Sequence, residues 1–287
     1  MVHFTRRTGK AFFTAAAGIL LSGSIQALEP EIKSGVSIAF MGDSISDMGF
    51  WDSGYCKLVI HGLKANRIVI KGIHAGVCNQ SSRQMIKRID SVIRRKPQVL
   101  TLNSGVNDIG QRVPLAEYKK NMTEMVERAQ KAGIIVYIVT ASLVREKLDN
   151  ATNTRMLPYN EFLRELAKSH NCKLAEVNIP MKEARRALEA KYPKMKDKNM
   201  LTKDGLHMTI RGDMVMAKAL LQAFGLTEQQ IEVAEKAWQK RIRTVPYQMD
   251  VSTYNEITKR AMAENISVDA YVARMIENEL KKEGNAK

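Results

Sequence analysis

The sequence predicts an α/β protein in which a parallel sheet is covered by helices on both faces. Between residues 36 and 225, short apolar runs rich in β-branched residues alternate with amphipathic stretches. Apolar runs bounded by turn residues indicate buried strands, and apolar residues three or four positions apart indicate helices. Strands that alternate with helices run parallel, because each helix crosses back over the sheet. Five strands are expected, at 36–41, 67–72, 98–103, 134–142 and 173–178.

Two helices between these strands have clear sequence signals. Pro114 is expected to open one of them, because proline fits the first turn of a helix. A second helix is expected over 156–170, and the polar run 143–156 before it is expected to be a long loop that lines the substrate site. The apolar face of the first helix comprises Leu115, Tyr118, Met122, Met125, Val126 and Ala129.

Residues 1–27 have the pattern of an export signal. Arg6, Arg7 and Lys10 precede an apolar core at 11–21 that is too short to span a bilayer, and "IQALEP" offers a cleavage site after Ala27. The paired arginines resemble a twin-arginine signal. We expect a periplasmic or secreted protein with no transmembrane segment once the signal is removed; an uncleaved anchor is the alternative.

The pattern changes after Gly225. "TEQQ" at 227–230 predicts a capping box that opens a connecting helix within 226–243. A strand is expected at 244–251, followed by two short helices with Ser252 and Ser267 as N-caps. The sequence therefore divides into a signal (1–27), a main domain (28–225), the connecting helix, and a strand–helix–helix appendage (244–287).

The appendage resembles a ribbon–helix–helix module, in which the strands of two chains pair. The resemblance implies a possible homodimer, and a simple packing appendage is the alternative. Nucleic acid is an unlikely partner on chemical grounds, because Asp250 on the outward face of the strand would repel phosphates.

Charge and cysteine content narrow the classes of partner. The formal net charge of +15 falls to +12 without the signal, which carries three cations and no acid, and a basic surface favours anionic partners.

The cysteines match no zinc spacing, and we expect no metal and no cofactor. In an oxidising compartment Cys56 and Cys78 can pair or remain free.

Residues suited to acyl transfer follow the ends of the predicted strands. Ligands of parallel sheets bind outside the carboxyl ends of the strands. Ser44 can act as a nucleophile only with a base, so His207 would take its proton while Asp204 holds the imidazole. The backbone N–H groups of Ser44 and Gly76 and the side-chain amide of Asn107 would stabilise the oxyanion.

These motifs, in this order, resemble the SGNH hydrolases, also called GDSL esterases. The resemblance rests on "GDS" at 42–44, Gly76, "GVND" at 105–108 and "DGLH" at 204–207, and covers about residues 35–225. It implies a flavodoxin-like three-layer fold, an ester substrate and no cofactor. It also implies the catalytic and oxyanion roles given above. Asn79 stands where many members have a second glycine, so a bulkier loop is expected beside the acyl pocket.

The expected function is that of an exported serine esterase acting on short-chain esters of carbohydrate, with an acetylated glycan as the expected substrate. Export, few aromatic residues and a basic surface favour this substrate. A lipase, lysophospholipase or thioesterase of the same family is the alternative enzyme. A surface-binding protein on a hydrolase fold is the alternative without catalysis.

Overall fold

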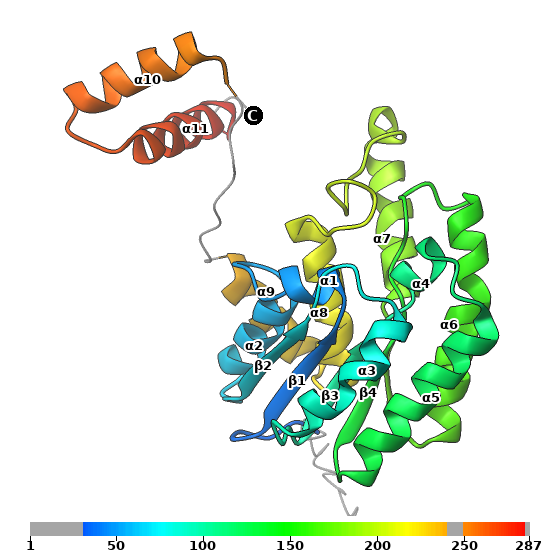
Figure 1. The fold of residues 1–287 in the computed structure, drawn as a ribbon. Coiled ribbons are helices and arrows are strands. Elements are labelled where there is room, and N and C mark those ends of the chain that lie inside the picture. The colour runs from blue at the N-terminus through cyan, green and yellow to red at the C-terminus, as the bar shows by residue number, and fades with distance from the viewer. Residues whose placement is uncertain (1–30, 240–248, 285–287) are drawn as a thin grey trace, which may run out of the picture. The chain divides into compact units, whose positions relative to one another are not determined.

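The computed structural model describes residues 31–239 and 249–284, and the chain divides into two compact units between Gln239 and Lys240. The first unit contains a five-stranded, fully parallel sheet in the order β2-β1-β3-β4-β5 (Figure 1). The predicted α/β fold with a five-stranded parallel sheet is confirmed. The strands are β1 (Ser37–Gly42), β2 (Lys71–Gly76), β3 (Val99–Asn103), β4 (Ile135–Val139) and β5 (Lys173–Ala175).

The predicted position of the second strand was wrong by four residues. β2 pairs with β1 over its whole length, from Ser37 opposite Lys71 to Gly42 opposite Gly76. The apolar residues Ile68 and Ile70 precede the strand and pack against the core from outside the ladder. Pairing with β1 therefore decides the strand, and Gly76 is its last residue instead of lying in the following loop.

The last two strands are shorter than predicted for a local reason. Beyond Val139 and Ala175, the Thr140 hydroxyl accepts hydrogen bonds from the backbone N–H groups of Val177 (2.8 Å) and Asn178 (3.0 Å). These side-chain contacts replace the ladder and lead the chain into the next helix.

Helices cover both faces of the sheet (Figure 1). On one face α2 (Tyr55–Ala65) packs against α8 (Ile210–Ala223) and α9 (Glu228–Gln239). On the other, α5 packs between α3 (Ser82–Ile93) and α6 (Ala151–Ser169). Helix α5 (Leu115–Lys131) follows Pro114 as predicted. The shorter elements are α1 (Ser44–Met48), α4 (Val106–Gly110), α7 (Asn178–Lys191) and the 3₁₀ turn Pro193–Met195.

Helix α6 starts earlier than predicted, which shortens the expected loop 143–156. The Asn150 side chain accepts hydrogen bonds from the backbone N–H groups of Thr152 and Asn153, so it caps a helix that begins at Ala151. An asparagine N-cap followed by no apolar periodicity is a weak sequence signal.

The connecting helix α9 has the predicted cap and is held to α2 by a tryptophan. Thr227 and Gln230 exchange the hydrogen bonds of a capping box. Trp238 is buried and its indole N–H donates to the Leu58 carbonyl at 2.8 Å. A hydrogen-bonded indole in the core ties the two helices together.

The second unit contains α10 (Val251–Ala263) and α11 (Val268–Gly284). Asp250, not Ser252, caps α10, because its carboxylate accepts from the Thr253 N–H at 2.8 Å. Residues 244–248 of the predicted strand lie outside the described residues, and Val251 is already helical. Three large apolar side chains of α11, Met275, Ile276 and Leu280, are exposed in this chain. Among the described residues, no helix combines the length and apolarity that a bilayer crossing requires.

Candidate active site

Ser44 lies where β1 turns into α1, at the carboxyl end of the sheet. Gly42 ends the strand, and Asp43 caps the helix by accepting a hydrogen bond from the Ile45 N–H at 2.9 Å. A Cβ at Gly42 would lie 2.2 Å from Ser46 Oγ and 3.0 Å from the Asn103 carbonyl oxygen, so the turn requires glycine. Ser44 is thereby placed, buried, on the first residue of α1.

The structure brings Ser44, His207 and Asp204 into one line of contacts. His207 Nε2 lies 3.0 Å from Ser44 Oγ, and His207 Nδ1 lies 2.6 Å from Asp204 Oδ2. An imidazole nitrogen that faces a carboxylate carries the proton, so Nδ1 donates to Asp204 and Nε2 is left to accept from the Ser44 hydroxyl. Asp204 Oδ1 also accepts from the backbone N–H groups of Leu206 and His207.

Two carboxylates near Ser44 have pKa values shifted in opposite directions. Burial raises the pKa of Asp204, but hydrogen bonds from the His207 ring and from the His207 and Leu206 backbone outweigh it and lower that pKa to about 2. Burial raises the pKa of Asp43 to about 6, against the hydrogen bond from Ile45. Asp204 is therefore ionised at neutral pH.

Gly76 is the last residue of β2, and Asn107 lies on α4, which follows β3. A Cβ at Gly76 would lie 2.2 Å from the Asp47 backbone nitrogen, so the close approach of α1 requires glycine whatever its chemical role. The Asn107 side-chain amide donates one hydrogen bond to the Gln80 carbonyl at 3.0 Å. Its second N–H, and the backbone N–H groups of Ser44 and Gly76, stay predicted oxyanion donors.

The loop after β2 accommodates the departure from the family pattern. Asn79 adopts a φ of 60°, in the left-handed region that glycine favours and asparagine tolerates. Of the two states left open for Cys56 and Cys78, the structure has the unpaired one, in which both thiols are free. Cys56 is buried beneath α1, whereas Cys78 is exposed and contacts Asp47 Oδ2 at 3.3 Å.

Arg88 is a residue of this site that sequence reasoning missed. Its guanidinium, on α3, donates to the Gly42 carbonyl at 2.8 Å and to the Ala75 carbonyl at 2.9 Å, and it also contacts the Gln80 side chain. It thus joins the ends of β1 and β2 beside Ser44. No local pattern distinguishes it from the other basic residues of α3, because both carbonyls are distant in the sequence.

A cavity of about 710 Å³ opens beside the loop that carries Asp204 and His207. Its lining includes Asp204 and Gly205 but neither Ser44 nor His207. The cavity therefore lies beside the Asp204 end of the Ser44–His207–Asp204 contacts. The remaining lining is largely charged and comes from 145–149, from α7 and from 196–199. Within 31–239 and 249–284, no three His, Cys, Asp or Glu side chains are grouped to hold a metal ion.

Comparison with solved structures finds the same fold in an acetylxylan esterase and in an α/β hydrolase enzyme. Axe2, an acetylxylan esterase from Geobacillus stearothermophilus, matches with a TM-score of 0.60 at 22% identity, over 69% of this chain and 97% of that chain. LAE5, an α/β hydrolase enzyme from the metagenome of Lake Arreo, matches with a TM-score of 0.59 at 24% identity, over 69% and 98% of the two chains. Variants of Axe2 with a serine, an aspartate or a histidine replaced by alanine are described as catalytic mutants.

No curated protein matches the chain in sequence. Residues 40–214, more than half of the chain, match the GDSL-like lipase/acylhydrolase family. The matched range starts in β1 just before Ser44 and ends in α8 just after His207. The fold, the order of the motifs and this match agree, and the chain belongs to the GDSL-like lipase/acylhydrolase family, whose members are carboxylic ester hydrolases.

Proposed function

We propose that the protein is an exported serine esterase that removes short acyl groups, acetyl above all, from carbohydrate. The observation that carries the proposal is the line of contacts from Ser44 Oγ through His207 to Asp204, at 3.0 Å and 2.6 Å. A serine, a base and an orienting carboxylate in this order are what nucleophilic catalysis at an ester requires.

In the proposed mechanism, Ser44 Oγ attacks the ester carbonyl carbon while His207 Nε2 takes the hydroxyl proton. Asp204 holds the imidazolium that forms. The oxyanion accepts hydrogen bonds from the N–H groups of Ser44, Gly76 and Asn107. His207 then returns the proton to the leaving alcohol, which gives the acyl-enzyme. A water molecule deprotonated by His207 attacks the acyl-enzyme, and the acid and free Ser44 are released.

Two observations favour a carbohydrate over a lipid as the alcohol. The cavity beside Asp204 is lined mainly by charged and polar side chains, which hydrogen-bond hydroxyl groups and repel acyl chains. Trp51 is exposed next to the 203–207 loop, and the Lys203 ammonium lies 5.7 Å from the centre of its ring. An exposed aromatic ring can stack on a sugar. The fold shared with an acetylxylan esterase agrees with this choice.

Location and assembly are part of the same proposal. The basic n-region and short apolar core within residues 1–27 support export to the periplasm or medium. The exposed apolar residues of α11 support a homodimer formed through the 240–287 unit. The mass of the full chain in solution tests the homodimer.

Hydrolysis of an aryl acetate by the wild type and Ser44→Ala tests the mechanism. We expect the turnover of Ser44→Ala to fall by at least about 10³-fold, because the remaining groups cannot replace the nucleophile. Ser46→Ala, two residues along the same helix, is the matched control and should stay within about tenfold of the wild type. Equal turnover of Ser44→Ala and wild type would refute the nucleophile.

A panel of substrates tests the proposed specificity. Acetylated xylo-oligosaccharides and aryl esters of increasing chain length should give the highest kcat/KM for acetate on a glycan. A preference for long acyl chains would reject the carbohydrate proposal in favour of the lipase alternative.

A further inference from the structure

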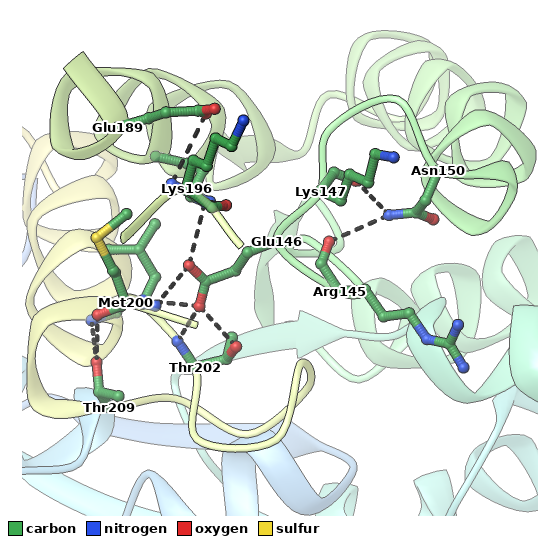
Figure 2. A network of polar contacts seen from close by, with 12 residues as sticks. Arg145, Glu146, Lys147, Asn150, Glu189, Lys196, Met200, Thr202 and Thr209 are labelled. Carbon is green, nitrogen blue, oxygen red and sulfur yellow. Dashed lines mark hydrogen bonds and ion pairs between the residues drawn. The ribbon is translucent and has the colours of Figure 1, made fainter. Parts of the chain in front are cut away.

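The buried carboxylate of Glu146 holds the segment that leads into the loop at 203–207 (Figure 2). Oε2 accepts from the Met200 backbone N–H at 2.7 Å, and Oε1 accepts from those of Leu201 at 2.7 Å and Thr202 at 2.5 Å. The Thr202 hydroxyl donates a fourth hydrogen bond to Oε1 at 2.7 Å. Three successive N–H groups that point at one anion fix the backbone conformation of 200–202.

Arg185, on α7, supplies the counter-charge that this buried anion needs. The Glu146 side chain is only 2% exposed and that of Arg185 only 3%, and Arg185 Nε lies 3.4 Å from Glu146 Oε2. The Arg185 guanidinium also donates to the Lys196 carbonyl and lies 3.7 Å from Glu189. Buried charged side chains are found paired and hydrogen-bonded, and these contacts join α7 and the 196–202 segment through Glu146.

The segment held by Glu146 forms the base of the loop. Thr202 pairs with Met208 across a single antiparallel bridge, and the Lys203 N–H donates to the His207 carbonyl at 2.7 Å. The neighbouring residue Arg145 reaches the other end of the loop, where its backbone N–H donates to the Gly205 carbonyl at 2.5 Å. The dipeptide 145–146 therefore contacts the loop on both sides of Asp204.

The dipeptide is itself held in an uncommon conformation. Arg145 has a φ of 55°, in the left-handed region, which a non-glycine residue keeps only where its surroundings impose it. The Asn153 amide, in the first turn of α6, donates to the Arg145 carbonyl at 3.1 Å, and the Asn150 amide donates to it at 3.2 Å. Helix α6 is thus the anchor from which 145–146 holds the loop.

We propose that Glu146, fixed by Arg185, is a positioning residue that sets the geometry of the Asp204–His207 pair. The proposal rests on the proposed function, in which that pair activates Ser44. Glu146 contacts neither Ser44 nor His207, so it acts through the backbone of 200–202. A displacement of about 1 Å at reacting groups can cost on the order of 10²-fold in rate. Loss of the carboxylate should therefore lower kcat more than it changes KM.

The experiment compares Glu146→Gln with Glu176→Gln in the full chain. Glu176 is a matched control, because it also pairs with an arginine (Arg164, 2.7 Å) and accepts a backbone N–H, but it has no hydrogen bond to residues 200–207. With an aryl acetate, Glu146→Gln should lower kcat about 10- to 100-fold and change KM less than about threefold. The downfield proton resonance of His207 Nδ1–H should shift or broaden in Glu146→Gln alone.

An unchanged kcat in folded Glu146→Gln, or an equal loss in Glu176→Gln, overturns the proposal. If Glu146→Gln does not fold, Thr202→Val decides: it removes one donor to Glu146 with little change of shape, and should lower kcat several-fold at constant KM. A kcat for Thr202→Val equal to that of the wild type overturns the proposal. Ser44→Ala is measured in parallel. Retained turnover in Ser44→Ala refutes the proposed function itself, which is a different outcome.

Discussion

Replacement of Arg88 by methionine should slow the proposed reaction without removing any group that contacts the substrate. The Ala75 carbonyl that Arg88 contacts belongs to the same peptide group as the Gly76 N–H. A cation on the carbonyl oxygen polarises that peptide and fixes its plane, so it strengthens the proposed oxyanion donor. Burial lowers the pKa of Arg88 to about 10, which leaves it charged at neutral pH.

The size of the effect follows from the contacts. Loss of one oxyanion donor costs about 10²–10³ in kcat. Arg88 acts on such a donor and does not replace it, so we expect a smaller fall, of about tenfold. In Arg88→Met the Gly42 and Ala75 carbonyls each lose a hydrogen bond from a charged donor. Such a bond contributes about 1.5–3 kcal/mol to stability when it is shielded from water. Since Arg88 is only partly buried, water can replace part of them, and the free energy of unfolding should fall by about 2 kcal/mol.

The assay is aryl acetate hydrolysis, with chemical denaturation of the same samples. Arg95→Met is the matched control, because Arg95 donates to the His74 carbonyl of the same strand at 2.6 Å, farther from Ser44 along β2. It should lose some stability and keep its kcat. Equal kcat values for Arg88→Met and the wild type would refute the argument that the guanidinium supports the Gly76 donor.

Two further predictions concern the buried acid and the thiols of the site. Because burial raises the pKa of Asp43 from 3.8 to about 6, the native state keeps a proton that the unfolded chain releases. The contribution of Asp43 to the free energy of unfolding should therefore fall as the pH rises from about 4 to 6, by at most about 3 kcal/mol. Asp43→Asn, which keeps an N-cap, should remove this slope in denaturation series at several pH values, and an unchanged slope would contradict the assignment. Native-state alkylation followed by mass spectrometry should label the exposed Cys78 well before the buried Cys56, whereas a disulfide-linked peptide joining them would contradict the free thiols.

Local patterns in the sequence determined the fold class and the members of the candidate site. The alternation of apolar runs with amphipathic stretches predicts a parallel sheet, and α5 was predicted from Pro114 and the apolar face that follows it. Ser44 and the Asp204–His207 pair could be proposed together because parallel strands all end at one edge of the sheet. The 3.0 Å contact between Ser44 Oγ and His207 Nε2 is consistent with that expectation.

The tertiary structure alone decided features that depend on partners far away in the chain. The bounds of β2 come from its register with β1. An apolar run in the sequence shows that a strand is near, but it does not show which of its residues pair with the neighbouring strand. Arg88 and Glu146 look like ordinary charged residues in the sequence. The carbonyl partners of Arg88 lie 13 and 46 residues away, and the backbone N–H partners of Glu146 lie 54–56 residues away. Periodicity reports which face of an element is buried. It does not report which distant carbonyl or N–H a buried charge will meet, because that depends on how the packed layers bring the chain together.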